Sequence, residues 1–347
     1  MLTLLLAGLS GFAWAADLAS MARPADSDEW GYIDPNGEFI VAPKYRKCFP
    51  FSDAGFAPIY DKKRKSWVFI DAEGGELAAE PTPLLLKSVM GFGAIGFTDG
   101  RAPFRDKKTK KWGYIGTDGK IAIPAQFDEV TRFDDGAAVA RKGENAYFVI
   151  DPSGAETPVR VPGLVDVKRF REGRAPIKLE SGMHGFVDTA GEVVVKPQFK
   201  SVGYFSEGLA WAKTVDGKVG YVDPSGNWAI DANFSAAKDF HDGVARVKNP
   251  DVWTYIDKTG ASAGISVGTT NVKDFSEGLA AGKKGDLFGF FDKTGTWVIE
   301  PAYENVRAFK NGYAAARKGD QWGFIDSTGV WAVKPTFTVV RDFERTR

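Results

Sequence analysis

One five-residue pattern recurs nine times along this chain of 347 residues. Most copies begin with an aromatic residue, continue with glycine and two apolar residues and end with aspartate, and another glycine follows three positions later. The copies begin, at steps of 34 to 45 residues, at Trp30, Trp67, Trp112, Tyr147, His184, Val219, Trp253, Phe288 and Trp322. Self-similarity at this period predicts one repeated structural unit rather than two or three unrelated domains.

Each copy divides into three short predicted strands. The first strand is the pattern itself, because its aromatic and β-branched residues favour a pleated surface, and it ends in an Asp-x-x-Gly turn, as at residues 223–226. In such a turn the aspartate accepts from turn amides and the glycine takes the left-handed conformation. We expect the second strand to stop at a proline such as Pro197 or Pro301, which cannot donate to the ladder. The third strand starts at the glycine of a Phe-x-x-Gly sequence, as at Gly208.

We therefore expect an all-β fold, a tandem array of nine three-stranded units of about 35 residues, because no stretch shows a long helical period. The last copy lacks a third strand, and Ala22-Arg23, within residues 17–29, resembles the strand end Ala212-Lys213. Residues 17–29 are therefore either a cap on an open superhelix or the closing strand of a propeller-like ring. Nine units exceed the usual four to eight blades of a propeller, so we favour the open, solenoid-like superhelix and keep the closed ring as the alternative.

The repeated residues resemble those of the bacterial WG-repeat (KWG-repeat) family, named for the pair found at Trp30-Gly31, Trp112-Gly113 and Trp322-Gly323. The resemblance covers residues 30–347. It implies an all-β repeat array, typical of exported or surface-associated bacterial proteins, with a binding or scaffolding role and no shared catalytic centre. The copies at Tyr147, His184, Val219 and Phe288 depart from the tryptophan of the name.

The amino terminus has the features of an export signal. Residues 1–16 form an apolar run that ends near Ala13-Trp14-Ala15, a small-x-small pattern that signal peptidases accept. The run is shorter than the roughly 20 residues that span a bilayer, so we expect no transmembrane segment in the mature chain. These features predict an exported protein, in the periplasm, the cell envelope or outside the cell.

Two sets of charged residues recur with the repeat. A basic residue stands five positions after the third-strand glycine, and this candidate binding stripe contains Arg105, Arg141, Lys178, Lys213, Lys248, Lys283 and Arg317. Before the third-strand glycine, directly or with one residue between in the case of Asp53, stand the acids Asp53, Asp99, Asp135, Glu172, Glu207, Asp242 and Glu277. Either acids and bases of adjacent units pair along a solvated edge, or the bases meet a repetitive polymer or a partner protein. The 45 basic and 45 acidic residues give no net charge, which favours pairing and argues against a nucleic-acid partner.

The tryptophans of the pattern form a candidate aromatic face, which contains Trp30, Trp67, Trp112, Trp253 and Trp322. If these rings stack inside the molecule, they form the spine of the core. If they lie on the surface, they resemble the platforms on which sugars bind. Tryptophan buries a large area but needs a partner for its N–H, so half-exposure is compatible with both interpretations.

The sequence predicts neither a catalytic centre nor a metal or cofactor. Each Asp-x-x-Gly turn offers one carboxylate, whereas a calcium loop needs several, and no nucleophile elbow, zinc motif or phosphate-binding loop is present. Cys48, His184 and His241 are expected to be structural. Since acids are plentiful, a hydrolase with paired carboxylates stays open as a remote alternative. Its pocket is expected near the insertion at Leu84–Met90, within the longest repeat step.

These observations lead to one functional hypothesis and a competitor. We expect a non-catalytic, exported repeat scaffold whose partner is another protein. The competitor is a module that binds carbohydrate or peptidoglycan, which requires exposed aromatic rings along one groove.

Overall fold

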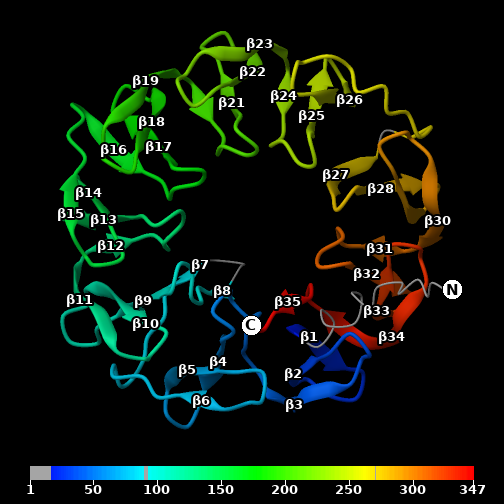
Figure 1. Ribbon diagram of the computed structural model, residues 1–347, viewed down its shortest axis with the longest axis horizontal. Coiled ribbons are helices and arrows are strands. Elements are labelled where there is room, and N and C mark those ends of the chain that lie inside the picture. The colour runs from blue at the N-terminus through cyan, green and yellow to red at the C-terminus, as the bar shows by residue number, and fades with distance from the viewer. Residues whose placement is uncertain (1–16, 90–92, 270) are drawn as a thin grey trace, which may run out of the picture.

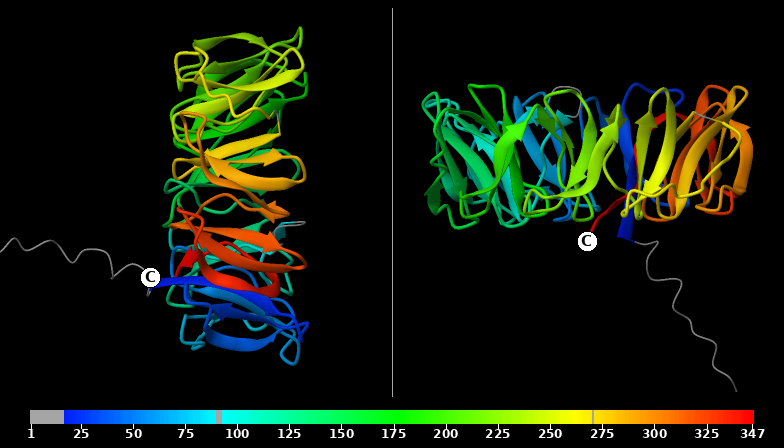
Figure 2. Two further views of the ribbon diagram at one scale, coloured as in Figure 1. Left: turned by 90° about the vertical axis from the view of Figure 1, so that its right-hand side faces the viewer. Right: turned by 90° about the horizontal axis from the view of Figure 1, so that it is seen from above.

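The computed structural model describes residues 17–89, 93–269 and 271–347, and the predicted signal at residues 1–16 lies outside them. The chain forms a closed ring of nine small antiparallel blades, seen face-on in Figure 1 and as a disc from the edge in Figure 2. The all-β tandem array is confirmed. None of the described residues forms a helix long and apolar enough to cross a membrane.

Most blades hold three or four strands, ordered from the inner side of the ring outwards. Blades 1 to 3 contain β1 (Leu18–Pro24), β2 (Trp30–Ile33), β3 (Phe39–Tyr45); β4 (Ala57–Asp61), β5 (Ser66–Ile70), β6 (Glu76–Leu77); and β9 (Arg101–Arg105), β10 (Trp112–Gly116), β11 (Ile121–Phe127). Blades 4 to 6 contain β12 (Glu129–Val130), β13 (Ala138–Lys142), β14 (Ala146–Ile150), β15 (Glu156–Pro158); β16 (Leu164–Val167), β17 (Arg174–Leu179), β18 (His184–Asp188), β19 (Val193–Phe199); and β20 (Ser201–Val202), β21 (Ala210–Lys213), β22 (Val219–Val222), β23 (Trp228–Phe234). Blades 7 to 9 contain β24 (Ala236–Ala237), β25 (Val244–Asn249), β26 (Val252–Asp257); β27 (Val272–Ser276), β28 (Leu279–Lys284), β29 (Leu287–Phe291), β30 (Trp297–Tyr303); and β31 (Asn305–Val306), β32 (Tyr313–Lys318), β33 (Gln321–Asp326), β34 (Trp331–Val340).

The two ends of the described chain close the ring by sharing blade 1. Strand β1 pairs with β2 on one side and with the end of β34 on the other, where Ala22 faces Val340 and Arg23 faces Val339. Ala212 and Lys213 face Val202 and Ser201 in the same register in blade 6. The resemblance between Ala22-Arg23 and Ala212-Lys213 thus reflects equivalent positions. The favoured open superhelix does not hold, and the alternative ring does, because β1 supplies the strand that the last repeat lacks.

The last strand strengthens this closure. Strand β35 (Glu344–Arg345) pairs with the start of β1, and the Thr346 amide donates to the Asp17 carbonyl at 2.8 Å. The buried Ser20 hydroxyl donates to the Arg341 carbonyl at 2.6 Å. Blade 1 is therefore built from both ends of the array, as in a propeller.

Among the described residues the core consists of nine hydrophobic clusters, and each lies between two neighbouring blades. In most of them a buried ring of the first strand meets the buried phenylalanine of the next Phe-x-x-Gly sequence edge to face, as Tyr114 meets Phe133 with centroids 4.9 Å apart. Tyr221 and Phe240 repeat this contact at 4.8 Å. Nine blades in an open row would have eight such interfaces, so the ninth cluster, between blades 9 and 1, is the packing that closes the ring.

The strand directions give the disc two different faces. The Asp-x-x-Gly and Phe-x-x-Gly turns lie at one end of each blade, which we call the turn face. The hairpins that join a third strand to the next first strand lie at the other end, which we call the hairpin face. The assignment follows from the antiparallel pairing of each strand with its neighbours.

The glycine of the Trp-Gly pair allows the second strand to pack closely against the first. A Cβ at Gly185 would lie 2.3 Å from the Val195 carbonyl oxygen and 2.8 Å from the Pro197 nitrogen. Between the paired residues His184–Phe199 and Phe186–Val195 the second strand bulges. Only glycine leaves room for this bulge.

This contact corrects one expectation and explains why the blades differ. The second strand does not stop at its proline: β19 and β30 run through Pro197 and Pro301 because these prolines lie in the bulge of the outermost, edge strand. Blades 2, 4 and 7 carry Val68, Phe148 and Thr254 in place of the glycine. Their outer strand has two or three residues, or is reduced to a single bridge.

The insertion near Leu84 is more than the surface loop that its position in the repeat suggests. Leu84 and Leu86 are buried, and the Arg105 amide donates to the Leu85 carbonyl at 2.7 Å. The segment therefore runs along β9 as the innermost part of blade 3, and a two-strand sheet follows, β7 (Ser88–Val89) and β8 (Gly93–Ala94). Met90, at the end of the insertion, lies outside the described residues.

Replacing Gly185 with alanine tests the close approach of the second strand. The new Cβ would push against the Val195 carbonyl, so we expect a loss of about 1–3 kcal/mol in the free energy of unfolding, as for other overpacked sites. Thr254→Ala is the control, because the exposed Thr254 takes the same strand position in blade 7; it should change stability by less than about 0.5 kcal/mol. Equal effects in urea denaturation would contradict this role of the glycine.

Candidate functional site at the hairpin face

The basic stripe and the aromatic face form one belt on the hairpin face. Each residue of the stripe lies directly across the third and first strands from the first residue of a pattern. Arg105 faces Trp112, Lys248 faces Trp253 and Arg317 faces Trp322. The two sets that the sequence suggested separately are thus cross-strand neighbours in blades 3, 7 and 9, whereas in blades 4, 5, 6 and 8 the basic residue faces Tyr147, His184, Val219 or Phe288.

The tryptophans line the core without forming its spine, since Trp67 belongs to a core cluster and Trp30, Trp112 and Trp322 pack against other clusters, and they are not open platforms. Trp67 is 7% exposed and the other four rings are half-buried, whereas the spine is made by the ring pairs between blades. Cations lie over four of these rings. Arg23 and Arg341 each lie 5.8 Å from the Trp30 centroid, and Lys47 lies 5.0 Å from that of Trp67. Lys87 and Arg105 lie 5.5 and 5.7 Å from the Trp112 centroid, and Lys238 and Arg246 lie 5.9 and 5.5 Å from that of Trp253. The belt therefore presents cations held by aromatic rings.

The acids before the glycines do not pair with the basic stripe, which corrects the expected charge pairing. They lie at the turn face, at the opposite end of the third strand, and most accept a hydrogen bond from the turn of the next blade. The Glu172 carboxylate accepts from the amides of Glu207 and Gly208 at 2.6 and 2.8 Å, and the Asp135 carboxylate accepts from the Gly173 amide at 3.0 Å. These bonds join consecutive blades from 3 to 9.

Each of these acids except Asp53 adopts a left-handed conformation, as Glu172 does with a φ of 51°. The following glycine is left-handed too, so the turn is a two-residue hairpin of type I′. Asn-Gly and Asp-Gly are pairs that this turn prefers, so the aspartates suit its first position, whereas Glu172, Glu207 and Glu277 are not explained by the turn alone. The bond to the next blade supplies the physical reason for an acid there.

The aspartates of the Asp-x-x-Gly turns cap their own turns, as expected. In the first turn the Asp34 carboxylate accepts from the Asn36 and Glu38 amides at 2.9 and 3.0 Å. A hydroxyl two residues on adds a bond at 2.6 Å in three turns, and these bonds, with the turn amides, lower the pKa of Asp151, Asp257 and Asp292. Within the described ranges, no group of three or more His, Cys, Asp and Glu residues could hold a metal ion.

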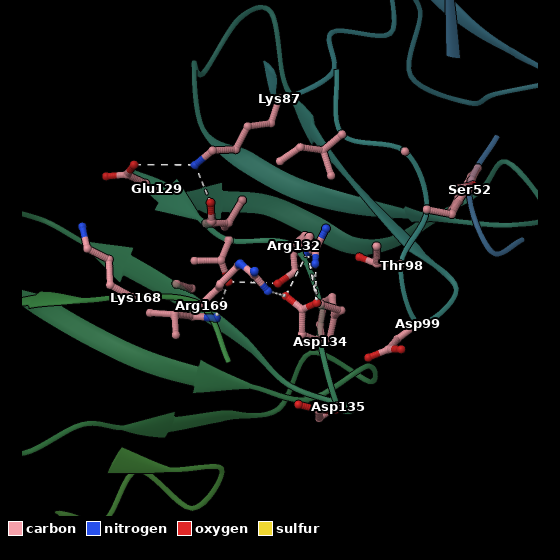
Figure 3. Close-up of a pocket in the computed structure, with 18 of the residues that line it drawn as sticks. Ser52, Lys87, Thr98, Asp99, Glu129, Arg132, Asp134, Asp135, Lys168 and Arg169 are labelled. Carbon is pink, nitrogen blue, oxygen red and sulfur yellow. Dashed lines mark hydrogen bonds and ion pairs between the residues drawn. The ribbon is translucent and has the colours of Figure 1, made fainter. Parts of the chain in front are cut away.

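A cavity of about 1080 Å³ lies on the inner side of the ring against blades 2 to 5 (Figure 3). Arg132 and Arg169 both contact the Asp134 carboxylate, at 3.0 and 3.1 Å. The Lys87 ammonium lies 3.5 Å from Glu129 and donates to the Val130 carbonyl. Burial lowers the pKa of Lys87. The charges that line the cavity are therefore largely paired with each other.

The cavity lies beside the insertion, which the sequence did suggest. Its arginines, in contrast, could not be found from the repeat, because Arg132 and Arg169 occupy the variable position before a buried phenylalanine. The same position holds Asp239 and Asp274 in blades 7 and 8. Position in the repeat therefore places these side chains but says nothing about their charge.

The sequence reasoning also missed two hairpins on the hairpin face, residues 61–66 of blade 2 and 106–111 of blade 3, which we call the lysine hairpins. Their sequences are Asp-Lys-Lys-Arg-Lys-Ser and Asp-Lys-Lys-Thr-Lys-Lys. The corresponding hairpins of blades 5 to 9 carry an acid at the tip, as at Glu180 and Asp251. The two lysine-rich runs are visible in the sequence and could have predicted a local basic surface, but the net charge of the whole chain, which is zero, gives no indication of them.

The remaining single residues take structural positions. Burial raises the pKa of the Cys48 thiol to about 12, as is typical of a packed cysteine. His184 is half-buried, and burial together with the charge of Lys178 lowers its pKa. His241 lies in the Phe-x-x-Gly turn of blade 7, bridged to Val244.

Removing a carboxylate between blades tests the bonds of the turn face. In Glu172→Ala two amides of the next blade lose their acceptor, so we expect a loss of about 1 kcal/mol in the free energy of unfolding. Glu172→Gln keeps one acceptor oxygen and should recover part of that loss. Chemical denaturation of the three proteins gives the comparison, and an alanine variant as stable as wild type would show that water replaces the bond without cost.

The lowered pKa values predict acid sensitivity. An aspartate whose pKa is lower in the folded state stabilises the fold above its unfolded value of about 3.9, and this contribution disappears as the pH falls through the folded value. Removing the hydroxyl partners raises these pKa values and should make stability depend less steeply on pH in this range. The variant is S153A/T259A/T294A, and the control that removes hydroxyls not bound to these aspartates is S181A/T214A/T336A. Parallel curves of thermal stability against pH for variant and control would contradict the assignment.

Comparison with known proteins agrees with the architecture. The family described as "WG containing repeat" matches residues 30–62, 112–145, 185–218, 220–251, 288–322 and 322–345. These matches fall on blades 1, 3, 5, 6, 8 and 9, which are the blades that have the glycine and the bulged outer strand. No curated protein gives a significant match.

Solved structures show distant likenesses. The computationally designed Ika8 protein has a TM-score of 0.40 at 14% identity, over 81% of this chain and 93% of its own. BamB from Moraxella catarrhalis gives 0.35 at 12%, over 82% and 86%, and KlHsv2 with loop 6CD replaced by a Gly-Ser linker gives 0.41 at 7%, over 72% and 96%. Since all these TM-scores are below 0.5, the assignment depends on the repeats and on the geometry that they share. The chain belongs to the WG-repeat family.

Proposed function

We propose that this protein is a non-catalytic repeat scaffold that binds another protein through the hairpin face of the ring. We further propose that it is exported and acts in the bacterial periplasm or envelope, on the basis of the apolar run and small-x-small pattern before Asp17.

The observation that carries the proposal is the belt of tryptophans covered by cations. Tryptophan, tyrosine and arginine are the residues most often found at the energetic centres of protein interfaces. A guanidinium that already lies over a ring, as Arg105 does over Trp112, loses little freedom when it meets a carboxylate or a carbonyl. Such pairs occur at Trp30, Trp67 and Trp112 of blades 1 to 3 and again at Trp253 of blade 7, which suits a partner that contacts several blades.

The same belt weighs against the carbohydrate-binding alternative. Sugars bind aromatic platforms through an open ring face, whereas two cations each lie over Trp30, Trp112 and Trp253. A sugar would have to displace these cations before it could stack. The cost of that exchange favours a partner that contacts the cations themselves.

The hydrolase alternative finds little support in the cavity. A general base needs a free carboxylate near its substrate, but two arginines hold Asp134. Asp99 and Asp135 accept from the amides of Gly136 and Gly173 in the next blades. These three carboxylates are therefore engaged in ion pairs or in hydrogen bonds between blades.

Site-specific photocrosslinking in cells tests the proposal with a matched pair of positions. Val215 on the hairpin face and Val330 on the turn face are valines of nearly equal exposure, 64% and 62%. With a benzoylphenylalanine at each position in turn, we expect a crosslinked protein from position 215 and none from position 330. Leu287, a second exposed apolar tip on the hairpin face, should crosslink as position 215 does.

Three outcomes would contradict the proposal. Equal crosslinking from both faces would indicate random contact, and crosslinks only to glycan would favour the carbohydrate module. Fractionation of the same cells tests the export, because retention of the protein in the cytoplasm would contradict it.

A further inference from the structure

The lysine hairpins carry exposed charge that the fold does not use. Their six exposed lysines are Lys62, Lys63, Lys65, Lys107, Lys108 and Lys110. No acid lies within ion-pair distance of any of them among the described residues. Six unpaired cations on two adjacent hairpins therefore face solvent, in a chain whose total charge is zero.

The backbone of each hairpin is fixed independently of its lysines. The Asp61 carboxylate accepts from the amides of Lys63 and Arg64 at 2.8 and 3.0 Å, and the Asp106 carboxylate accepts from the amide of Thr109 at 2.6 Å. Arg64 is occupied by Glu76, at 2.6 Å. The nearby acids are thus engaged in holding the turns and Arg64, and the lysine side chains are left to act outward.

The two hairpins act together because they belong to neighbouring blades. Blades 2 and 3 share one core cluster, and Phe69 of β5 packs against Phe97, which precedes β9, with centroids 4.5 Å apart. Figure 1 shows β4 and β5 next to β9 and β10 in the ring. Acids on the far side of the disc are screened, since the Debye length at physiological salt is about 8 Å. A ligand at the hairpins therefore meets a local positive field.

The surroundings indicate which kind of anion fits. A flat anionic membrane would cover the whole hairpin face and meet the acids at the other tips, Asp251 and Asp286, whose side chains are fully or almost fully exposed. A sugar polymer would find no open ring nearby, because Trp67 is buried beneath Lys47 and Trp112 lies against Lys87 and Arg105. A flexible acidic chain, in contrast, can confine its contacts to two hairpins.

We infer that the lysine hairpins bind an acidic segment of a partner protein, a run of glutamates and aspartates in extended conformation. This inference rests on the proposed protein-binding role of the hairpin face and names the chemistry of the segment that docks there. Recognition by flexible lysines is mainly electrostatic, so it provides steering and local attachment more than sequence specificity.

The test measures binding of a fluorescent peptide of alternating glutamate and serine to the full chain by fluorescence polarisation. Two triple variants remove the charges of one hairpin each, K62Q/K63Q/K65Q and K107Q/K108Q/K110Q. The matched control K218Q/K284Q/K318Q removes three exposed lysines from hairpins of blades 6, 8 and 9 on the same face. We expect each hairpin variant to weaken binding by at least about fivefold and the control by less than about twofold, and wild-type affinity should fall steeply as salt is raised.

Several results would overturn the inference. If the control weakens binding as much as the hairpin variants do, the peptide responds only to total charge. If phosphatidylglycerol vesicles or a single-stranded oligonucleotide bind the wild-type protein but not the hairpin variants, while the acidic peptide does not bind, the surface binds a lipid or a nucleic acid instead. The melting temperatures of all variants should match wild type, because these side chains are exposed.

The two proposals can fail separately. If the protein crosslinked at position 215 is still captured by both hairpin variants, the scaffold role stands and the acidic-segment inference fails. If the peptide binds through the lysines but no protein is crosslinked from the hairpin face, the surface binds acidic chains and the proposed scaffold role fails.

Discussion

The ring depends on the packing between neighbouring blades, and at most of these interfaces an aromatic ring of the first strand meets, edge to face, the buried phenylalanine that precedes the third strand of the next blade. Tyr32 and Phe51 meet edge to face between blades 1 and 2 with ring centroids 5.0 Å apart, and across the closure Phe324 and Phe343 meet at a tilt with centroids 4.4 Å apart. A three- or four-stranded blade cannot bury both of its faces alone. Each blade is therefore stable only between two others, and a row of blades gains one more interface when its ends meet.

The Trp-Gly glycine has a different task, which is to position the outermost strand. Where glycine is present, as at Gly289, the second strand bulges against it and runs on to an aromatic residue beside the first position of the pattern. Where a side chain takes its place, as at Phe148, the outer strand has only three residues. The family pattern thus records a requirement for close backbone approach rather than a property of the tryptophan ring.

The two sets of charged residues that recur with the repeat lie at opposite faces of the disc. Acids such as Glu172 and Asp257 accept from turn amides on the turn face, where they join blades or cap turns. Bases such as Arg105 and Arg246 lie over aromatic rings on the hairpin face. Because the acids before the third-strand glycines bond to turn amides, they do not pair with the basic stripe. Other acids do pair with bases of the hairpin face, as Asp274 does with Arg246 at 2.5 Å, so the exposed positive charge is concentrated at the lysine hairpins.

The sequence by itself determined the period, the three strands of each unit, the turn aspartates and the identity of the family. These features are local: a turn such as Asp34–Gly37 forms from hydrogen bonds among neighbours in the chain, and its spacing is visible without a structure. The match between Ala22-Arg23 and Ala212-Lys213 even named the strand that closes the ring. A count of nine units was nevertheless a poor guide to closure, because closure depends on the angle between blades, which accumulates from nine packed interfaces.

Only the tertiary structure decided which repeated residues meet. The spacing suggested that acids and bases of adjacent units pair. In the structure every such acid lies at the start of a third strand and every such base at its end, as Glu172 and Lys178 do at the two ends of β17. The tryptophans looked like core or platform, and the cations that cover them come in part from other strands, as Arg341 does for Trp30. Strand pairing and the packing of blades around the ring determine such neighbours, and neither can be predicted from the spacing of residues within one repeat.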